Sequence, residues 1–357
     1  MKCFTKPSLI AVSVCFVLAV RLNAATRTWD GGGLNGSFSD PVNWDGNATF
    51  PTTINDTLQA GANAGGGGSS FIGFDTGSEF RTPSFTFLST ASTAYIVTAN
   101  SSSDFLTLTA SGMALQNLSP IRQNFSLIVT TVGAATQTWD GGAQGLVLAQ
   151  IDLGSSHVLS IDGTGTSATT RNEISGGISG NASGLTKTGA GTLVLRNAGL
   201  PSDYTGSTTL LNGRLQLGLA NQIPNTSKLV LSGGTFDTGG FSETAGVLSL
   251  GGSAAIDFGT SNTVSLVFGD SHSELWSAGT LNILNFTAGA DSLRVGTNAS
   301  ALTAGQLAQI SFSGQPASIS STGFLLPVPE PDVFATILSG LGVFGFYRGG
   351  RNRRVTT

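Results

Sequence analysis

Two short motifs have the residue types of a catalytic acid–base pair. Residues 75–77 and 237–239 are both Asp-Thr-Gly, and each triplet follows a phenylalanine. Two carboxylates held at close range share one proton and can activate water, as in the aspartic proteases. Asp-Thr-Gly is also an ordinary turn sequence, and such a motif needs structural context. Because the second triplet lies in a repetitive, glycine-rich stretch, we expect the two aspartates to be far apart.

A serine nucleophile and a metal centre have less support. The segment Gly-Asp-Ser-His at 269–272 resembles the nucleophile block of the GDSL esterases, but the triad also needs a histidine later in the chain. The two histidines, His157 and His272, do not supply one. Two isolated histidines give transition metals no ligand set, and no calcium-loop register occurs. We therefore expect no catalytic residue, no metal and no cofactor.

Three tryptophans precede Asp-Gly turns, and they are candidate glycan contacts. Trp29, Trp44 and Trp139 lie in the motifs TWDGGG, NWDGN and TWDGG. An aromatic ring at a turn can stack on a sugar, although large aromatic side chains are more often buried. Both interpretations stay open for these residues.

The composition differs from that of an ordinary globular enzyme and favours an all-β protein. The chain has 357 residues, of which 50 are Gly and 10% are charged, whereas about 25% is usual. Without the seven basic residues near the two ends, nine Lys and Arg remain against 19 acids before Asp332. This acidic balance disfavours nucleic-acid binding, which requires cations to neutralise phosphates.

Short apolar alternations recur in the second half of the chain. Successive alternations begin roughly 14 to 22 residues apart, which we interpret as one coil of a β-solenoid per repeat. Glycines at corners would supply positive φ; the candidates are Gly189, Gly191, Gly206 and Gly213. The alternations begin at Leu193, Leu215, Leu229, Leu248, Leu266 and Leu281.

One segment resembles a known repeat family. The stretch GLTKTGAGTL at 184–193, then YTG at 204–206 and GRLQL at 213–217, resembles the autotransporter-associated β-strand repeat, or passenger-associated transport repeat. The resemblance implies a right-handed parallel β-helix in an exported surface protein, without catalytic residues. No segment after Gly218 resembles the outer-membrane barrel of autotransporters, so we expect that another signal directs this chain.

The N-terminus has the features of a signal peptide. Lys2 and Lys6 precede an apolar block at 9–20, and small residues follow at 24–25. Cleavage there would remove both cysteines, Cys3 and Cys15, so that the mature chain could form no disulfide.

The C-terminus combines a Val-Pro-Glu-Pro motif, an uncharged apolar run at 333–347 and an arginine cluster. Arginines beyond an apolar segment are typical of a cytoplasmic flank. The three parts in this order resemble the PEP-CTERM sorting signal of Gram-negative bacteria, which implies processing by an exosortase. The predicted motif is Val328, Pro329, Glu330 and Pro331, and the predicted membrane-stop cluster is Arg348, Arg351, Arg353 and Arg354.

The sequence thus predicts four segments: a signal peptide at 1–25, a β-rich region at 26–175, a β-solenoid at 176–326 and a sorting signal with a transmembrane helix at 327–357. The leading hypothesis is a non-enzymatic structural or adhesive protein, displayed on the cell surface or in the extracellular matrix. Its expected partners are signal peptidase, exosortase, the membrane and extracellular polysaccharide. A β-helix enzyme that degrades polysaccharide, with Asp237 and Asp257 as candidate acids, and a glycan-binding adhesin stay open as alternatives.

Overall fold

The computed structural model describes residues 24–33, 35–47, 55–62, 70–132, 136–199, 201–260 and 263–329. Nearly all of the predicted signal peptide lies outside these ranges. Glu330 and Pro331 of the predicted sorting motif, the apolar run and the four terminal arginines also lie outside them. Among the described residues, no helix is both long enough and apolar enough to cross a membrane.

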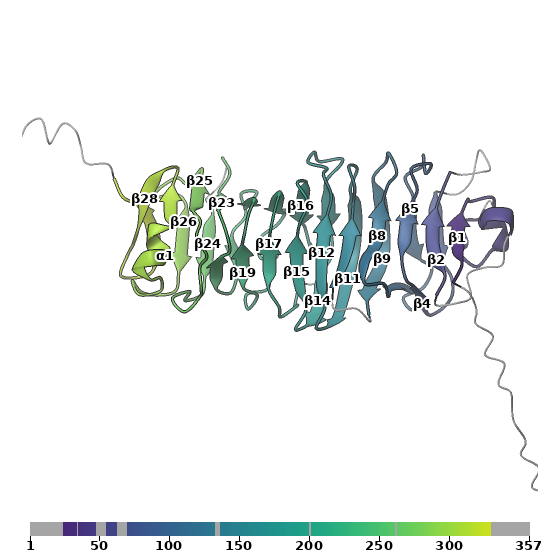
Figure 1. The fold of residues 1–357 in the computed structure, drawn as a ribbon, viewed down its shortest axis with the longest axis horizontal. Helices are drawn as coiled ribbons and strands as arrows, with labels where there is room; N and C mark the ends of the chain where they lie inside the picture. Colours follow the sequence, from purple (N-terminus) through teal and green to yellow (C-terminus); the bar gives the residue numbers. More distant parts are fainter. Residues whose placement is uncertain are drawn as a thin grey trace, which may run out of the picture.

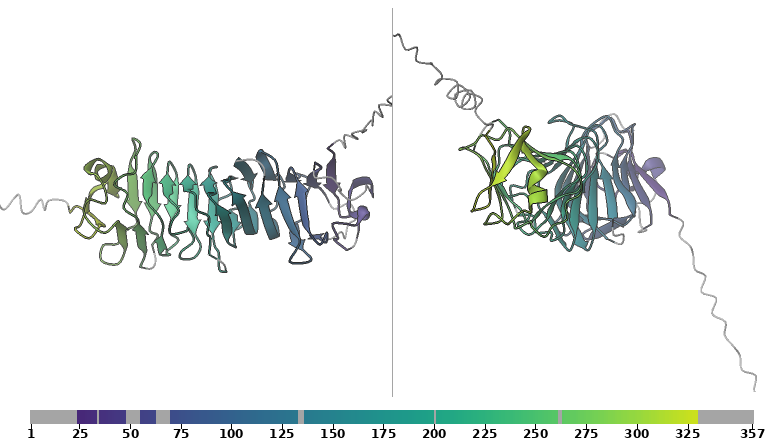
Figure 2. Two further views of the ribbon diagram at one scale, coloured as in Figure 1. Left: turned by 90° about the horizontal axis from the view of Figure 1, so that it is seen from below. Right: turned by 60° about the vertical axis from the view of Figure 1, so that its left-hand side comes forward.

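The described chain forms an elongated rod of stacked coils (Figure 1). Strands follow one another along the long axis, from β1 at one end to β28 near the other, and the views in Figure 2 show the same stacking. Almost every strand pairs in parallel with a strand one coil away, and the helices are short. The predicted all-β solenoid is therefore confirmed.

The first face of the rod is one ten-stranded parallel sheet. Its pairing passes directly from β12 to β15, across the boundary predicted near residue 175. The division of the chain at that boundary stays a prediction. The strands of this face are β1 (Thr26–Trp29), β2 (Thr57–Ala60), β5 (Phe85–Phe87), β8 (Gly112–Asn117), β10 (Thr136–Asp140), β12 (Val158–Asp162), β15 (Gly184–Lys187), β17 (Thr208–Leu210), β19 (Leu229–Leu231) and β22 (Leu248–Leu250).

The second face is also parallel, and two long strands, β9 and β11, continue from it onto the third face. The strands of the second face are β3 (Phe71–Phe74), β6 (Ile96–Ala99), β9 (Gln123–Thr131), β11 (Leu146–Ser155), β13 (Asn172–Ile174), β16 (Thr192–Leu195), β18 (Arg214–Leu217), β20 (Thr235–Asp237), β23 (Ala254–Asp257), β25 (Leu281–Leu284) and β27 (Ile310–Phe312).

The third face is shorter and interrupted. Between β14 and β21 its place is taken by irregular chain, in which the amide of Asp203 donates to the carbonyl of Ile178 in the preceding coil. Besides the far halves of β9 and β11, its strands are β4 (Glu79–Thr82), β7 (Phe105–Leu108), β14 (Ile178–Asn181), β21 (Glu243–Thr244), β24 (Ser265–Phe268) and β26 (Ser292–Val295).

Alternation of side chains explains the core. Successive residues of a strand point to opposite sides of the sheet. In β18, Leu215 and Leu217 are buried, whereas Arg214 and Gln216 between them are partly exposed. The neighbouring strands repeat this pattern, so the apolar residues of all coils join in one continuous core along the rod.

The predicted repeat intervals are correct for only some of the alternations. Leu193 lies opposite Leu215 on the second face, and Leu229 lies opposite Leu248 on the first face. Leu215 and Leu229, however, lie on different faces of one coil, so the interval between them is not a coil length. The true coil length also varies, because one coil of the first face leads from Thr26 to Thr57 and a much shorter one leads from Leu231 to Leu250.

The predicted corner glycines serve two purposes. Gly189 and Gly213 have the expected positive φ, with values of 20° and 70°. Gly191 and Gly206 do not, and for these two the prediction of positive φ is wrong. A Cβ on Gly191 would lie 2.6 Å from the carbonyl oxygen of Gly165, and one on Gly206 would lie 2.5 Å from that of Ser183. Close backbone stacking between coils therefore explains these two glycines.

Both ends of the rod are capped. At the N-terminal end, the 3-10 segments η1 (Pro41–Asn43) and η2 (Asp45–Asn47) cover the edge strand β1, where Trp29 pairs with Trp44 in an isolated antiparallel bridge. At the other end, the helix α1 (Ala304–Ala308) and the antiparallel strands β28 (Gln315–Ile319) and β29 (Phe324–Pro327) cover the last coils. Covered edges prevent further strand addition.

Candidate binding groove

An open groove with a volume of about 510 Å³ crosses the outer surface of the second face, near the middle of the rod. Small residues form part of its lining, and the segment between β12 and β13 contributes to one wall. The groove is lined by Thr166, Arg171, Ala190, Thr192, Gly213, Arg214, Gln216, Thr235 and Asp237.

The local sequence explains why these side chains face outward. The amide of Arg214 donates to the carbonyl of Gly191, and the amide of Thr235 donates to that of Gly213, so each strand begins directly above the preceding corner. Thr192, Arg214 and Thr235 then lie opposite one another in the pairing. Because side chains alternate along strands, Gln216 and Asp237 form a second outward row beside the first.

Arg214 joins two acids from successive coils. Its Nη1 lies 2.6 Å from Asp237 Oδ2 and 3.5 Å from Asp257 Oδ2. Gln216 Nε2 also donates to Asp237 Oδ2, at 2.8 Å. Asp237 and Asp257 each accept a backbone amide two residues ahead, from Gly239 and Gly259. Both carboxylates are therefore fixed in position by charge-assisted hydrogen bonds.

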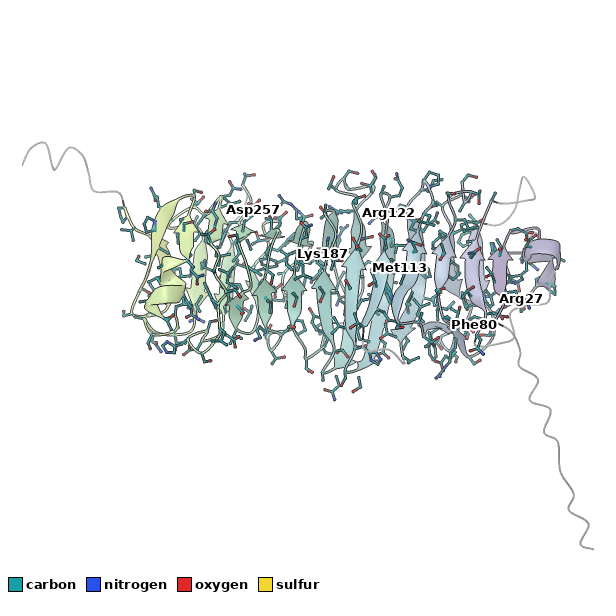
Figure 3. The ribbon with its side chains drawn as sticks, in the orientation of Figure 1. Arg27, Phe80, Met113, Arg122, Lys187 and Asp257 are labelled. Carbon is teal, nitrogen blue, oxygen red and sulfur yellow. The ribbon has the colours of Figure 1, made fainter. Side chains whose placement is uncertain are left out.

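The hydrogen bonds and ion pairs also extend from Gln216 toward the N-terminal end of the rod. Arg171 Nη1 donates to Gln216 Oε1 at 3.3 Å, and its Nη2 lies 3.8 Å from Glu173 Oε2. Arg122 Nη2 lies 3.4 Å from the same carboxylate oxygen. Arg122 and Asp257, at the two ends of this network, lie toward the same long edge of the rod in Figure 3.

A fourth arginine completes this surface. Arg196 directly follows β16, is exposed, and lies beside Gly218 of the next coil. Its side chain makes no hydrogen bond or ion pair with the part of the chain that the structure describes. We refer to Arg122, Arg171, Arg196 and Arg214 as the arginine strip.

The two Asp-Thr-Gly triplets are not brought together. Asp75 follows β3 and accepts hydrogen bonds from Ser39, whereas Asp237 ends β20. The strands β6, β9, β11, β13, β16 and β18 of the second face lie between β3 and β20. Each strand adds one full strand spacing to the separation, so the two carboxylates cannot share a proton, as expected from the sequence.

The Gly-Asp-Ser-His segment has a structural role. Ser271 is fully buried, and its hydroxyl donates to the carbonyl of Gly269 at 3.0 Å and accepts the amide of Leu248 at 2.9 Å. The hydroxyl therefore completes the hydrogen bonding of the edge strand β22. No group of three or more His, Cys, Asp and Glu side chains that could hold a metal occurs among the described residues.

The three tryptophans proposed as glycan contacts are in the core. Trp29, Trp44 and Trp139 are each at most 1% exposed. The indole nitrogen of Trp44 donates to the carbonyl of Phe38 at 2.9 Å, and the Trp29 and Trp44 rings meet edge to face. A sugar has no access to these rings in this structure, which instead agrees with the packing interpretation.

The segment that resembles the passenger repeat contains both core and groove residues. Lys187 is buried at the end of β15, and its Nζ donates to the carbonyls of Thr188 and Gly189 at 2.6 and 2.7 Å. Burial lowers the pKa of Lys187 to about 8, although nearby Asp162 opposes this shift. Tyr204 is buried as well, and its hydroxyl hydrogen-bonds with that of Thr208 at 2.6 Å. These residues stabilise corners between coils.

The groove residues Arg171 and Gln216 were not identified as a site from the sequence. They are far apart in the chain and meet only because β13, β16 and β18 are stacked in register. In the sequence, Arg214 and Gln216 are distinguished only as part of the repeat. Their alternation with Leu215 and Leu217 was the available signal that they face outward.

Comparison with known proteins supports the repeat. Residues 185–217 match the family model of the passenger-associated transport repeat. This match confirms the resemblance for the repeat, and it includes Arg214 and Gln216 of the groove. No curated protein and no solved structure matches the chain.

Proposed function

We propose that this chain is an exported, non-enzymatic β-solenoid that an exosortase sorts to the cell envelope or extracellular matrix, where it has a structural or adhesive role. The observation that carries the proposal is the passenger repeat at 185–217 within a rod of parallel coils. Repeats of this kind support a surface-exposed β-helix protein. A rod with two capped ends is suited to a spacer or a display surface.

The proposed sorting depends on the C-terminal sequence. The Val-Pro-Glu-Pro motif directly follows β29, the last strand of the cap, since Pro327 ends this strand and Val328 begins the motif. A processing enzyme would therefore reach the motif without unfolding a coil. The apolar run and arginine cluster beyond it would hold the precursor in the inner membrane until cleavage.

Cleavage of polysaccharide is the second function that the sequence left open. Asp237 and Asp257 lie opposite each other on β20 and β23, as paired acids of a glycosidase could. Arg214 contacts both carboxylates, and each also accepts a backbone amide. The oxygens of both carboxylates thus already act as hydrogen-bond acceptors within the protein, whereas a glycosidase needs one of its two acids to donate a proton to the substrate. We therefore favour binding over catalysis.

The sorting proposal is tested by the mature C-terminus. Mass spectrometry of the protein from exosortase-positive cells should show a chain that ends near Pro331, and the exosortase-deleted strain should retain the chain to Thr357. A chain with Pro329→Ala and Pro331→Ala should resemble the deletion strain. A change at a distant exposed residue, Leu275→Ser, is the matched control. The same full-length C-terminus in both strains would contradict the proposal.

A further inference from the structure

The arginine strip concentrates positive charge on an otherwise acidic rod. Four of the nine basic residues between the predicted signal peptide and the predicted tail belong to it. Three acids contact the strip, namely Glu173, Asp237 and Asp257. The rest of residues 26–326 has five basic residues and 15 acids. Local charge of this kind attracts anions even when the whole protein is acidic.

We propose that the groove and the arginine strip bind an acidic polysaccharide whose sugars carry carboxylates. This inference rests on the proposed function, because it names the ligand class of a surface-exposed adhesive rod. The chain of sugars would lie along the rod axis, across successive coils of the second face.

The arginines have donors free for a ligand. Arg214 uses Nη1 for both of its ion pairs, and Nε and Nη2 have no partner in the described chain. The whole guanidinium of Arg196 is without a partner there. Guanidinium groups present several N–H donors in a planar fork that fits a carboxylate with two hydrogen bonds. The strip can therefore bind carboxylates at more than one coil.

The remaining lining suits sugar hydroxyl groups. Thr166, Thr192 and Thr235 provide hydroxyls, and Asp237 provides a carboxylate that accepts hydrogen bonds. Arg171, Gln216 and Asp237 already hold one another, so their positions are fixed before a ligand arrives. Preorganised polar groups reduce the entropic cost of binding.

The mixture of charges favours a uronate polymer over a nucleic acid. Affinity for nucleic acids requires many cations along the phosphate backbone, and single strands are also bound by stacking on aromatic rings. The strip has four arginines beside three carboxylates, and no aromatic residue lines the groove. A polymer with one carboxylate per sugar and many hydroxyls is the better complement.

The test measures binding of the full-length purified chain to three uronate polymers: polygalacturonate, alginate and hyaluronate. Neutral dextran is the ligand control. The chain should bind at least one uronate polymer, more weakly at high salt because exposed charges are screened. A double variant, Arg171→Gln with Arg196→Gln, should bind about tenfold more weakly or worse, since it removes two charge-assisted contacts.

Arg81→Gln is the matched control for charge removal. Arg81 is an arginine of β4 on the third face, with a half-exposed side chain that pairs only with Glu79 among the described residues. This variant should keep its affinity within about twofold. Arg196→Gln alone removes no hydrogen bond or ion pair within the described chain, so it should fold normally and still weaken binding.

Three outcomes would overturn the inference: no binding to any of the three polymers, equal binding to dextran, or unchanged affinity of Arg196→Gln and of the double variant. None of these results bears on processing at the C-terminus. Conversely, a protein that binds uronates but keeps its full-length tail in every strain would contradict the sorting proposal alone. The two proposals can therefore fail separately.

Discussion

The coils near the N-terminal end of the rod and the coils at residues 187–250 differ in length and in core composition. On the first face, the long coils near the N-terminus lead from Thr26 to Thr57, from Leu58 to Phe85 and from Phe85 to Leu115. The coils at residues 187–250 lead from Lys187 to Leu210, from Leu210 to Leu231 and from Leu231 to Leu250, and each of them is shorter than any of the first three. Among the described residues, ten buried aromatic side chains lie up to Trp139, whereas two, Tyr204 and Phe236, lie within 187–250. We call the two types wide coils and narrow coils.

We infer that interior volume is one cause of the difference in coil length. Wide coils enclose rings such as Phe85, Phe87 and Phe125, which meet at centroid distances of 5.0 to 5.7 Å. Narrow coils enclose leucines instead, and their corners stack backbone on backbone at Gly191 and Gly213. Protein interiors are close-packed. We therefore expect different substitutions to destabilise the two types of coil: loss of a ring in the wide coils and an added methyl group at a corner of the narrow coils.

The largest effect is expected in the wide coils. Phe125→Ala removes a fully buried ring that packs against Phe85 and Phe87. We expect the free energy of unfolding to fall by about 3–5 kcal/mol, because a large cavity remains. Leu215→Ala in a narrow coil should cost about 1 kcal/mol less, because less volume is removed. Urea denaturation measures both.

Leu118→Ala is the control for Phe125→Ala, because Leu118 lies in the same region and is 49% exposed. It should change stability by less than about 0.5 kcal/mol. If Leu215→Ala were as costly as Phe125→Ala or more so, interior volume would not explain the two coil types. Hydrogen exchange should show the loss of protection mainly in adjoining coils, because coils contact only their neighbours.

A smaller effect is expected from a methyl group at a corner of the narrow coils. In Gly213→Ala the new Cβ would lie 2.4 Å from the carbonyl oxygen of Gly191, and φ is +70°. Backbone strain and overpacking together should cost about 2–4 kcal/mol. Thermal unfolding of the purified variant measures this loss.

Gly112→Ala is the matched control from a wide coil. Gly112 has a similar φ of +77°, but no atom lies within 4 Å of its added Cβ. Only the strain of positive φ should remain, at about 1 kcal/mol. Equal losses for the two variants would mean that φ alone matters and that the narrow corners are not tightly stacked.

The fold class could be predicted because its causes are local. Alternating apolar residues, as in the GRLQLG segment, predict strands, and glycines predict corners. The assignment of strands to faces could not be predicted, because an inward pair looks the same in sequence on every face. Leu215 and Leu229 therefore resembled successive coils, although they lie on two faces of one coil.

The groove could not be predicted from the sequence, because its residues come from segments far apart in the chain. Gln216 meets Arg171 from two coils earlier and Asp237 from the next coil. These contacts depend on the length of every coil between them, and that length varies with core volume and irregular loops. The tryptophans of the Trp-Asp-Gly turns, by contrast, are visible in single segments as candidate sugar contacts, but their large rings are buried in the core.

The smallest effect concerns a buried acid of the narrow coils and depends on pH. Glu243 opens β21 and accepts the amide of Gln222 from the preceding coil at 2.7 Å. Burial raises the pKa of Glu243 to about 7, although amide hydrogen bonds from Gln222, Ile223 and Thr244 oppose this. In the unfolded chain the pKa is near 4.5. Folding therefore favours the protonated form of Glu243.

The direction of the effect follows from this difference. The contribution of Glu243 to stability is fully present below pH 4.5 and is lost as the pH rises through about 7. Between pH 5 and pH 8 we expect a loss of about 2 kcal/mol. In Glu243→Gln this loss of stability should disappear, because the amide does not titrate.

Urea denaturation at both pH values measures the difference in stability between the variant and the unchanged chain. A buried acid of the wide coils, Asp56, has a cation beside it: its Oδ2 lies 3.4 Å from Nε of Arg27. Asp56→Asn should therefore leave the loss between pH 5 and pH 8 in place, and a variant at Glu243 that kept the full loss would show that another group causes it.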